Sequence, residues 1–198
     1  MPDIERLLGR VINLSASPRD LAAVRKALGQ LPRLKLLLSS GGFFECAPEL
    51  ASRLDGVSSA LNGLRTGLEK ELAENPPARL SDGGVMREGA NAELDELRSV
   101  RRDSQKLLTD IELGEKEKTG ISTLKVGYNG VFGYFIEVSK AQAPKVPHYF
   151  VRKQTLVNAE RYITEELKTL ENKILGAEEK MSKLESHLFG GLREKVRA

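Results

Sequence analysis

The sequence has 198 residues, of which 40% are hydrophobic and 30% charged, with a formal net charge of +3. This balance is typical of a folded, helix-rich protein and excludes a disordered tail. No apolar run approaches the roughly 18 to 20 residues that span a bilayer, and the first residues lack a signal-peptide core, so we expect a cytoplasmic protein without membrane contact. The single cysteine, Cys46, excludes an intramolecular disulfide and a cysteine-based zinc site, and we expect it to be a buried or incidental thiol.

Several helices are predicted in the first 75 residues. Residues 3–14 place their apolar side chains on one helical face, and Ser17, which precedes a proline, is the expected N-cap of a second helix. A third, short helix is expected at residues 34–38. From residue 49 to residue 72, apolar residues recur at spacings of three and four until Asn75-Pro-Pro ends the helix. The apolar positions of this last helix are Leu50, Leu54, Val57, Leu61, Leu64 and Leu68.

Two long helices are predicted in the rest of the chain. The first is highly charged and runs from Asn91 to about Lys118, a length of roughly 40 Å at a rise of about 1.5 Å per residue. The second begins after Thr164, its expected N-cap, with Glu165 and Glu166 in the first turn, where the helix dipole favours acidic side chains. Its apolar positions follow a heptad pattern, which favours packing against another helix. These positions are Leu167, Leu170, Ile174, Ala177, Met181, Leu184 and Leu188.

Between the two long helices the pattern changes to that of β-strands. Alternating residues around Val126 predict one strand, Asn129-Gly130 is a strong signal for a short hairpin, and Phe132 to Val138 is the expected return strand. Short extended pieces are expected at Tyr149–Val151 and at Thr155–Val157. The aromatic residues of this segment are expected to pack within a small core rather than to stack on bases. They are Tyr128, Phe132, Tyr134 and Phe135.

The β segment carries a local excess of positive charge that is larger than that of the whole chain. Between Thr123 and Tyr162 the acidic residues are Glu137 and Glu160. A basic, aromatic segment held by two helices suits contact with phosphates, because lysine and arginine neutralise charge without reading base sequence. A solvated hairpin with a miniature core is the alternative on composition alone. The basic residues are Lys125, Lys140, Lys145, Arg152, Lys153 and Arg161.

Two blocks of this segment resemble the clamp of the MutS family of bacterial DNA mismatch-repair proteins. They are Gly127-Tyr-Asn-Gly-Val-Phe-Gly-Tyr-Phe-Ile-Glu-Val-Ser-Lys140 and Tyr149-Phe-Val-Arg-Lys-Gln-Thr-Leu-Val-Asn-Ala-Glu-Arg-Tyr-Ile-Thr164. The resemblance continues in the family's order from Asp3-Ile-Glu-Arg-Leu-Leu to Asn172-Lys-Ile-Leu-Gly-Ala-Glu-Glu.

The resemblance implies a mainly α fold, in which a multihelical lever with long antiparallel helices carries a small β-rich clamp inserted at its tip. The first part of the lever is expected at residues 1–104, the inserted clamp at residues 105–164 and the returning lever helix at residues 165–198. The chain therefore resembles an excised piece, because it begins at a lever segment and finishes within a long helix.

The function implied by the resemblance is that of a non-catalytic module. It contacts the backbone of double-stranded DNA without sequence specificity and couples DNA binding to an ATPase domain found elsewhere in full-length relatives. ATP and magnesium belong to that domain, so no cofactor is expected in this chain. Further implied partners of full-length relatives are mismatched DNA, a second copy in a homodimer and a MutL-type repair protein. The implied location is the bacterial cytoplasm, in association with the nucleoid.

Two asparagines match motif positions that the family uses near the DNA backbone. Asn129 belongs to the Gly-Tyr-Asn motif, and Asn158 to the Thr-Leu-x-Asn-Ala-Glu-Arg motif. Each has a local alternative, because Asn129 suits the left-handed position of a turn and Asn158 suits a cap of nearby backbone. Val157 stands where relatives often have lysine, which moves the expected phosphate contacts to other cations. These are Lys140, Arg152, Lys153 and Arg161.

Two further patterns are expected to be coincidental. Phe43-Phe44-Glu45 matches the Phe-x-Glu motif with which MutS proteins read a mismatch, but here it lies between two lever-like helices, whereas the family's motif belongs to a separate domain. The glycines between Gly127 and Gly133 fit neither spacing of a phosphate-binding loop and are interpreted as turn and strand glycines.

No Walker motif, acid–base pair or nucleophile elbow is present in the sequence, so we expect no enzymatic activity from this chain. The leading hypothesis is a DNA-binding and lever module. The alternative is a scaffold that associates through the heptad seam and binds a peptide at its β tip.

Overall fold

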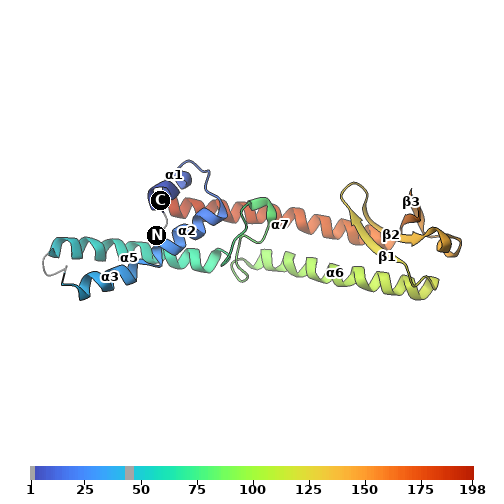
Figure 1. Cartoon of the computed structure of the whole chain (residues 1–198), viewed down its shortest axis with the longest axis horizontal. Coiled ribbons are helices and arrows are strands. Elements are labelled where there is room, and N and C mark those ends of the chain that lie inside the picture. The colour runs from blue at the N-terminus through green and yellow to red at the C-terminus, as the bar shows by residue number, and fades with distance from the viewer. Residues whose placement is uncertain (1–2, 43–46) are drawn as a thin grey trace. The chain divides into compact units, whose positions relative to one another are not determined.

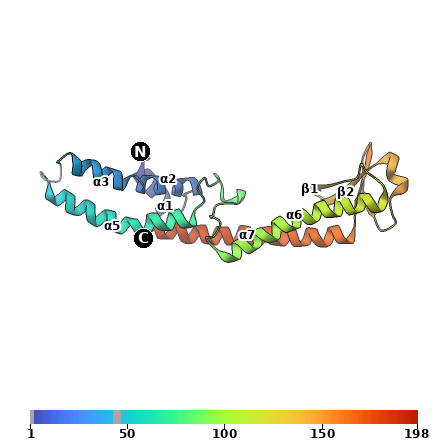
Figure 2. The same ribbon diagram turned by 90° about the horizontal axis from the view of Figure 1, so that it is seen from below.

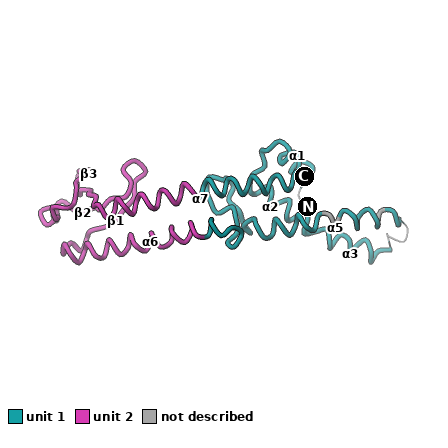
Figure 3. The backbone as a smooth tube through the Cα atoms, turned by 180° about the vertical axis from the view of Figure 1, so that it is seen from behind, with its two compact units in different colours: residues 1–95, 181–198 teal, residues 96–180 magenta. Residues whose placement is uncertain are grey.

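The computed structural model describes residues 3–42 and 47–198 and forms two compact units (Figure 1). Unit 1 comprises residues 1–95 and 181–198, and unit 2 comprises residues 96–180 (Figure 3). The expected class, mainly α with a small β-rich insertion between two long helices, is confirmed. The predicted boundaries of lever and clamp remain a prediction.

Unit 1 is helical. Its elements are α1 (Ile4–Ile12), α2 (Pro18–Leu28), α3 (Leu31–Ser40), α5 (Pro48–Glu71), the 3-10 turn η1 (Leu80–Asp82), the start of α6 (Ala92–Thr119) and the end of α7 (Glu165–Arg197). Ser17 caps α2 as predicted, since its side chain accepts a hydrogen bond from the backbone N–H of Asp20 at 3.2 Å. Val57, expected on the buried stripe of α5, is instead 51% exposed.

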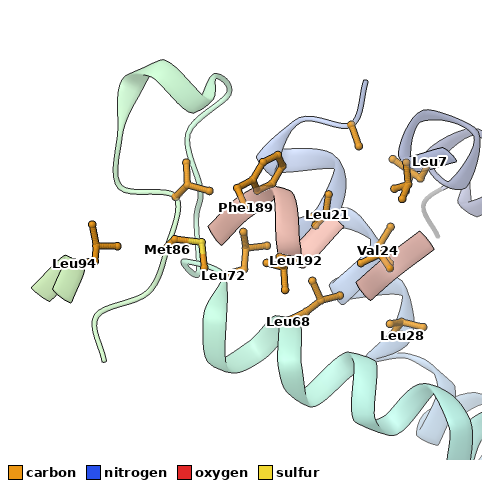
Figure 4. Packing of buried hydrophobic residues seen from close by; sticks show 14 residues of the cluster. Leu7, Leu21, Val24, Leu28, Leu68, Leu72, Met86, Leu94, Phe189 and Leu192 are labelled. Carbon is orange, nitrogen blue, oxygen red and sulfur yellow. The ribbon is translucent and has the colours of Figure 1, made fainter. Parts of the chain in front are cut away.

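The core of unit 1 lies where α2, α5 and the end of α7 meet (Figure 4). Leucines supply most of its fully buried side chains, as the helical spacing requires. Its labelled members are Leu7, Leu21, Val24, Leu28, Leu68, Leu72, Met86, Leu94, Phe189 and Leu192.

In unit 2, residues 96–119 of α6 and 165–180 of α7 lie side by side (Figures 1 and 2). They are antiparallel, because Arg101 near one end of this pair forms an ion pair with Glu178 at 3.4 Å, while Ile111 farther along packs with Leu170 and Ile174. Leu170 and Ile174 are buried, which confirms the heptad prediction at these positions.

Unit 2 also holds a four-stranded antiparallel sheet in the order β1-β2-β4-β3. One face covers the helices through an apolar cluster that includes Leu124, Ile136, Val138, Tyr162 and Leu167. The strands are β1 (Lys125–Asn129), β2 (Gly133–Ser139), β3 (Val151–Thr155) and β4 (Ala159–Ile163), with the 3-10 segment η2 (Lys140–Lys145) after β2.

The connections between sheet and helices are short. Residues 120–124 join α6 to β1, and two of the five, Ile121 and Leu124, are almost fully buried. A single residue, Thr164, separates β4 from α7, and its hydroxyl accepts a hydrogen bond from the backbone N–H of Leu167 at 3.2 Å. The predicted N-cap at Thr164 is therefore confirmed.

The short hairpin predicted at Asn129-Gly130 is confirmed, because β1 and β2 pair antiparallel across the loop of residues 130–132. Two other features of the sheet differ from expectation. The expected extended piece at residues 155–157 is the end of β3 and the start of a turn, and β4 was not predicted at all. Leu156 donates its backbone N–H to the carbonyl of Ala159 at 2.8 Å, so the chain reverses here and continues as a further strand.

Candidate functional site

The turn between β3 and β4 lies against the end of β2. Ser139, the last residue of β2, pairs with Ala159, and the backbone N–H of Lys140 donates to the carbonyl of Asn158 at 3.1 Å. The side chains of Lys140 and Asn158 are exposed. Neither makes a hydrogen bond or ion pair within the described residues 3–42 and 47–198. The structure therefore brings these two predicted contact residues together and leaves their polar atoms accessible.

Arg152 and Lys153 lie on β3, at one edge of the sheet. Arg152 pairs in register with Tyr162, Gln154 pairs with Arg161, and Lys153 between them is the extra residue of a bulge. Bulges at sheet edges redirect side chains and interrupt the regular ladder. Lys153 is exposed and has no side-chain partner in the part of the chain that the structure describes.

Arg152 is partly neutralised by a neighbouring carboxylate. Its guanidinium lies 3.5 Å from Glu160, whose side chain is 15% exposed. Glu160 also accepts a hydrogen bond from the Tyr162 hydroxyl. Burial, followed by this bond to Glu160, raises the pKa of Tyr162 to about 12, so the phenol remains a donor at neutral pH.

Arg161 is fixed on the sheet by three neighbours. Its guanidinium donates to Glu137 at 2.9 Å and to Gln154 at 3.1 Å, and lies 4.1 Å from the ring centre of Phe135. The Phe135 ring in turn lies across Gly127, where an added Cβ atom would stand 2.7 Å from the ring. Arg161 thus serves the packing of the sheet, with most of its charge balanced by Glu137.

Asn129 ends β1 and shapes the loop that follows. Its side-chain oxygen accepts hydrogen bonds from the backbone N–H groups of Val131 at 2.8 Å and Phe132 at 3.4 Å. Its φ angle is not positive; the left-handed residue of this hairpin is Gly133, with φ +77°. Asn129 therefore has a local role in the turn, as the alternative predicted. The predicted left-handed backbone conformation was wrong, because the side chain of Asn129 stabilises the turn instead.

The two motif asparagines lie at opposite ends of the sheet. Asn129 pairs with Gly133 at the start of β2, whereas Asn158 lies beside Ser139 at its end. Seven residues of β2 separate these levels, which corresponds to about 20 Å at roughly 3.3 Å per residue. The six predicted contact residues therefore do not form one cluster.

Carboxylates of both helices hold the β1–β2 hairpin. Glu171 of α7 accepts the backbone N–H of Tyr134 at 3.0 Å, and Glu112 of α6 accepts that of Val126 at 2.9 Å. A hydrogen bond from Lys116, followed by the one from Val126, lowers the pKa of Glu112. Sequence patterns gave no signal for these contacts, because a glutamate on a helix normally faces solvent.

A third carboxylate fixes the segment before β3. Glu115 of α6 is only 3% exposed and accepts the Tyr149 hydroxyl at 2.7 Å and the Lys118 ammonium at 3.0 Å. Burial, followed by the bond to Glu115, raises the pKa of Tyr149 to about 12. The buried carboxylate is thus paired on both sides, as a charge in this position requires.

The aromatic residues divide between core and surface. Phe135 is buried and Tyr134 half-buried, as predicted. Tyr128 and Phe132 were expected to pack in the core but are 55% and 50% exposed. Phe132 lies in the loop before β2, and the Tyr128 ring lies against that of Tyr134, at 4.8 Å between ring centres.

Two negative findings concern the described residues alone. Among residues 3–42 and 47–198, no group of three or more histidine, cysteine or acidic side chains is placed to hold a metal ion. None of the described helices is both long enough and apolar enough to cross a membrane. The Phe43-Phe44-Glu45 pattern and Cys46 lie outside the described residues.

Residues 89–180 match the family model described as MutS family domain IV. Three curated proteins, each named DNA mismatch repair protein MutS, align with almost the whole chain. The one from Thermodesulfovibrio yellowstonii is 45% identical over 188 residues, or 95% of this chain and 21% of the relative. The one from Lachnoclostridium phytofermentans is 43% identical over 194 residues, or 98% and 20%. The one from Methanothrix thermoacetophila is 44% identical over 196 residues, or 99% and 22%.

The chain belongs to the MutS family. It spans about a fifth of the length of the MutS proteins it matches. The stretch that matches MutS domain IV contains all four strands and all six predicted contact residues. The predicted site is thus placed in a defined part of the MutS architecture, while its contacts with DNA stay a prediction.

Proposed function

We propose that the sheet of unit 2 contacts the sugar–phosphate backbone of duplex DNA, independently of base sequence, as part of a MutS-like mismatch-repair protein. One observation carries the proposal. Lys140, Lys153 and Asn158 are exposed on the sheet and its adjoining turns, and none of these side chains has a partner in the described part of the chain. Exposed cations and amide donors of this kind suit phosphate oxygens and do not discriminate between bases.

The six predicted contacts differ in how freely they can meet a phosphate. Lys140, Lys153 and Asn158 are available without losing any other interaction, and Arg152 must share its charge with Glu160. Arg161 is engaged by Glu137 and Gln154. Arg161 would have to give up these partners to contact a phosphate, so it is the least available of the six residues.

We further propose that this chain is non-catalytic, and that its helices couple DNA binding to an ATPase domain elsewhere in the longer protein. The short junctions around Ile121 and Thr164 support the coupling, because a displacement of the sheet must displace the helices joined to it. Mismatched DNA, a second MutS subunit and a MutL-type protein are the proposed partners of the longer protein.

The proposal is tested by measuring duplex affinity over a salt series. A fluorescent homoduplex and a matched duplex with one mismatch are titrated with the unaltered chain and with Arg152→Ala/Lys153→Ala. Log K should fall with log salt, by about 0.9 for each phosphate contact, and the double variant should bind more weakly with a shallower slope. The two duplexes should bind alike, because the proposed contacts involve only the backbone.

Lys106→Ala is the control, since Lys106 is an exposed lysine of α6 outside the sheet. It should leave the slope unchanged. Equal slopes for the unaltered chain and the double variant would move the contact surface away from β3, and a clear preference for the mismatched duplex would contradict contact with the backbone alone.

A further inference from the structure

The sheet has two unlike ends. The anchored end comprises Asn129 and Gly133, together with the loop between them, and the cationic end comprises Lys140 and Asn158. They are separated by the length of β2, about 20 Å at roughly 3.3 Å per residue. In Figure 1 the loop between β1 and β2 lies over α7, whereas η2 lies beyond the start of that helix. A duplex at one end therefore need not touch the other.

The charge around the anchored end is unfavourable for a phosphate. From Val126 to Ser139 the sequence contains no lysine or arginine. The carboxylate of Glu171 lies against Gly133 and accepts the backbone N–H of Tyr134. Arg101 lies near Tyr134, but its guanidinium is paired with Glu178 at 3.4 Å. The exposed side chains here are apolar or aromatic: Tyr128, Val131 and Phe132.

Two of the predicted cationic contacts lie away from this end. Arg152 and Lys153 belong to β3, the edge strand that is farthest from β1 in the order of the sheet. Three spacings of about 4.8 Å separate β1 from β3, so Asn129 lies at the corner of the sheet opposite the cationic end. Its side-chain oxygen is already used by the N–H groups of Val131 and Phe132.

We propose that the duplex contacts the cationic end and β3 only, and that Asn129 is a positioning residue that shapes the hairpin without touching DNA. This assignment rests on the proposed function and narrows it. Both asparagines were predicted from sequence motifs to contact DNA, and the assignment gives them different roles. The amide of Asn158 donates a hydrogen bond to the backbone of the duplex, whereas the side-chain oxygen of Asn129 accepts hydrogen bonds from N–H groups of its own loop.

Substitution by aspartate distinguishes the two roles. Asn129→Asp keeps the oxygen that accepts from Val131 and Phe132, but it removes the amide donor and adds a negative charge. Asn158→Asp makes the same chemical change at the cationic end. A residue that faces a phosphate cannot tolerate this change, because its hydrogen bond is replaced by repulsion. A residue whose side chain only accepts hydrogen bonds from backbone N–H groups can tolerate the change to aspartate.

The test measures the affinity of both variants for a fluorescent homoduplex at low salt, using the full chain. Asn158→Asp should bind about tenfold more weakly, the loss expected for one charge-assisted hydrogen bond. Asn129→Asp should bind within about twofold of the unaltered chain. Asn129→Ala, which removes the acceptor, should speed amide hydrogen exchange at Val131, and Asn129→Asp should restore its protection.

The outcomes separate this assignment from the proposed function. Loss of binding in Asn129→Asp, with amide protection at Val131 intact, would show that Asn129 faces DNA and would overturn the assignment alone. Retained affinity in Asn158→Asp would likewise overturn it, because Asn158 would then make no contact with the duplex. Absence of salt-dependent binding by the unaltered chain would overturn the proposed function and this assignment with it.

Discussion

Gly133 lies so close to Glu171 that a Cβ atom added to the glycine would stand 1.7 Å from the Oε1 atom of the carboxylate. The same oxygen accepts the backbone N–H of Tyr134 at 3.0 Å, and Gly133 has a φ angle of +77°. The start of β2 thus requires a residue without a side chain for two independent reasons, its backbone conformation and its contact with α7.

Gly133→Ala should lower the free energy of unfolding by about 2 to 4 kcal/mol, the sum of a strained backbone and a displaced hydrogen bond to Glu171. Urea unfolding measures the loss. Gly130→Ala is the matched control, since its φ is not positive and no atom lies within 4 Å of an added Cβ there. Similar losses in the two variants would show that the contact with Glu171 has no energetic weight.

Adjacent residues of α7 should differ in their contribution to stability. Ile174 is 3% exposed and packs with Ile111 and Leu170, whereas its neighbour Leu175 is 41% exposed. Ile174→Ala should cost about 2 to 4 kcal/mol and Leu175→Ala less than about 1 kcal/mol. Thermal or urea unfolding measures both losses of stability. Comparable losses in the two variants would mean that the two helices of unit 2 do not pack through the predicted seam.

Arg161 should act on stability more than its exposed basic neighbours do. Arg161→Ala removes the contact with the Phe135 ring and leaves Glu137 without its partner, a loss of about 1 to 2 kcal/mol. Lys153→Ala and Lys140→Ala should remain within about 0.5 kcal/mol of the unaltered chain. The prediction fails if Arg161→Ala unfolds at the same urea concentration as Lys153→Ala.

Glu112 should make stability depend on pH on the acid side. Its pKa is lowered in the folded chain, by the hydrogen bonds from Lys116 and from the backbone of Val126. Its contribution is therefore fully present above the ordinary glutamate pKa of 4.5 and is lost as the pH falls through the lower folded pKa. Glu112→Gln should flatten the fall in stability below about pH 5, because the amide does not titrate.

Glu117→Gln is the matched control on the same helix, since Glu117 is exposed. Urea midpoints measured from pH 3 to 7 compare the variants. A pH profile of Glu112→Gln that coincides with that of Glu117→Gln would show that the bond to Val126 does not discriminate between the protonation states of Glu112.

Local patterns predicted the helices and their caps well. Ser17 and Thr164 both cap as expected, because the preference of a hydroxyl for the free N–H groups of a first turn depends on neighbouring residues only. The buried positions Leu170 and Ile174 follow from helical spacing for the same reason. Membership in the MutS family could also be predicted from the sequence, because several long blocks in a fixed order are more specific than any single motif.

The sheet was harder to predict, because its geometry depends on residues that are far apart in sequence. Glu171 lies 37 residues after Tyr134 yet fixes the start of β2, and no local pattern predicts this contact. No local pattern shows that Arg161 is engaged by Glu137, 24 residues away. The six contacts were predicted one by one from motifs and charge, and only the pairing of strands places Asn129 and Asn158 at opposite ends.

The one-residue junction at Thr164 also bears on proteolysis. Because β4 ends at Ile163 and α7 begins at Glu165, with Thr164 itself 5% exposed, a protease meets no extended, accessible peptide between sheet and helix. In the other junction, the buried side chains of Ile121 and Leu124 hold the exposed Ser122 and Thr123 between them. Limited digestion of the folded chain should spare both junctions, so that the strands and the helical segments joined to them survive as one resistant fragment.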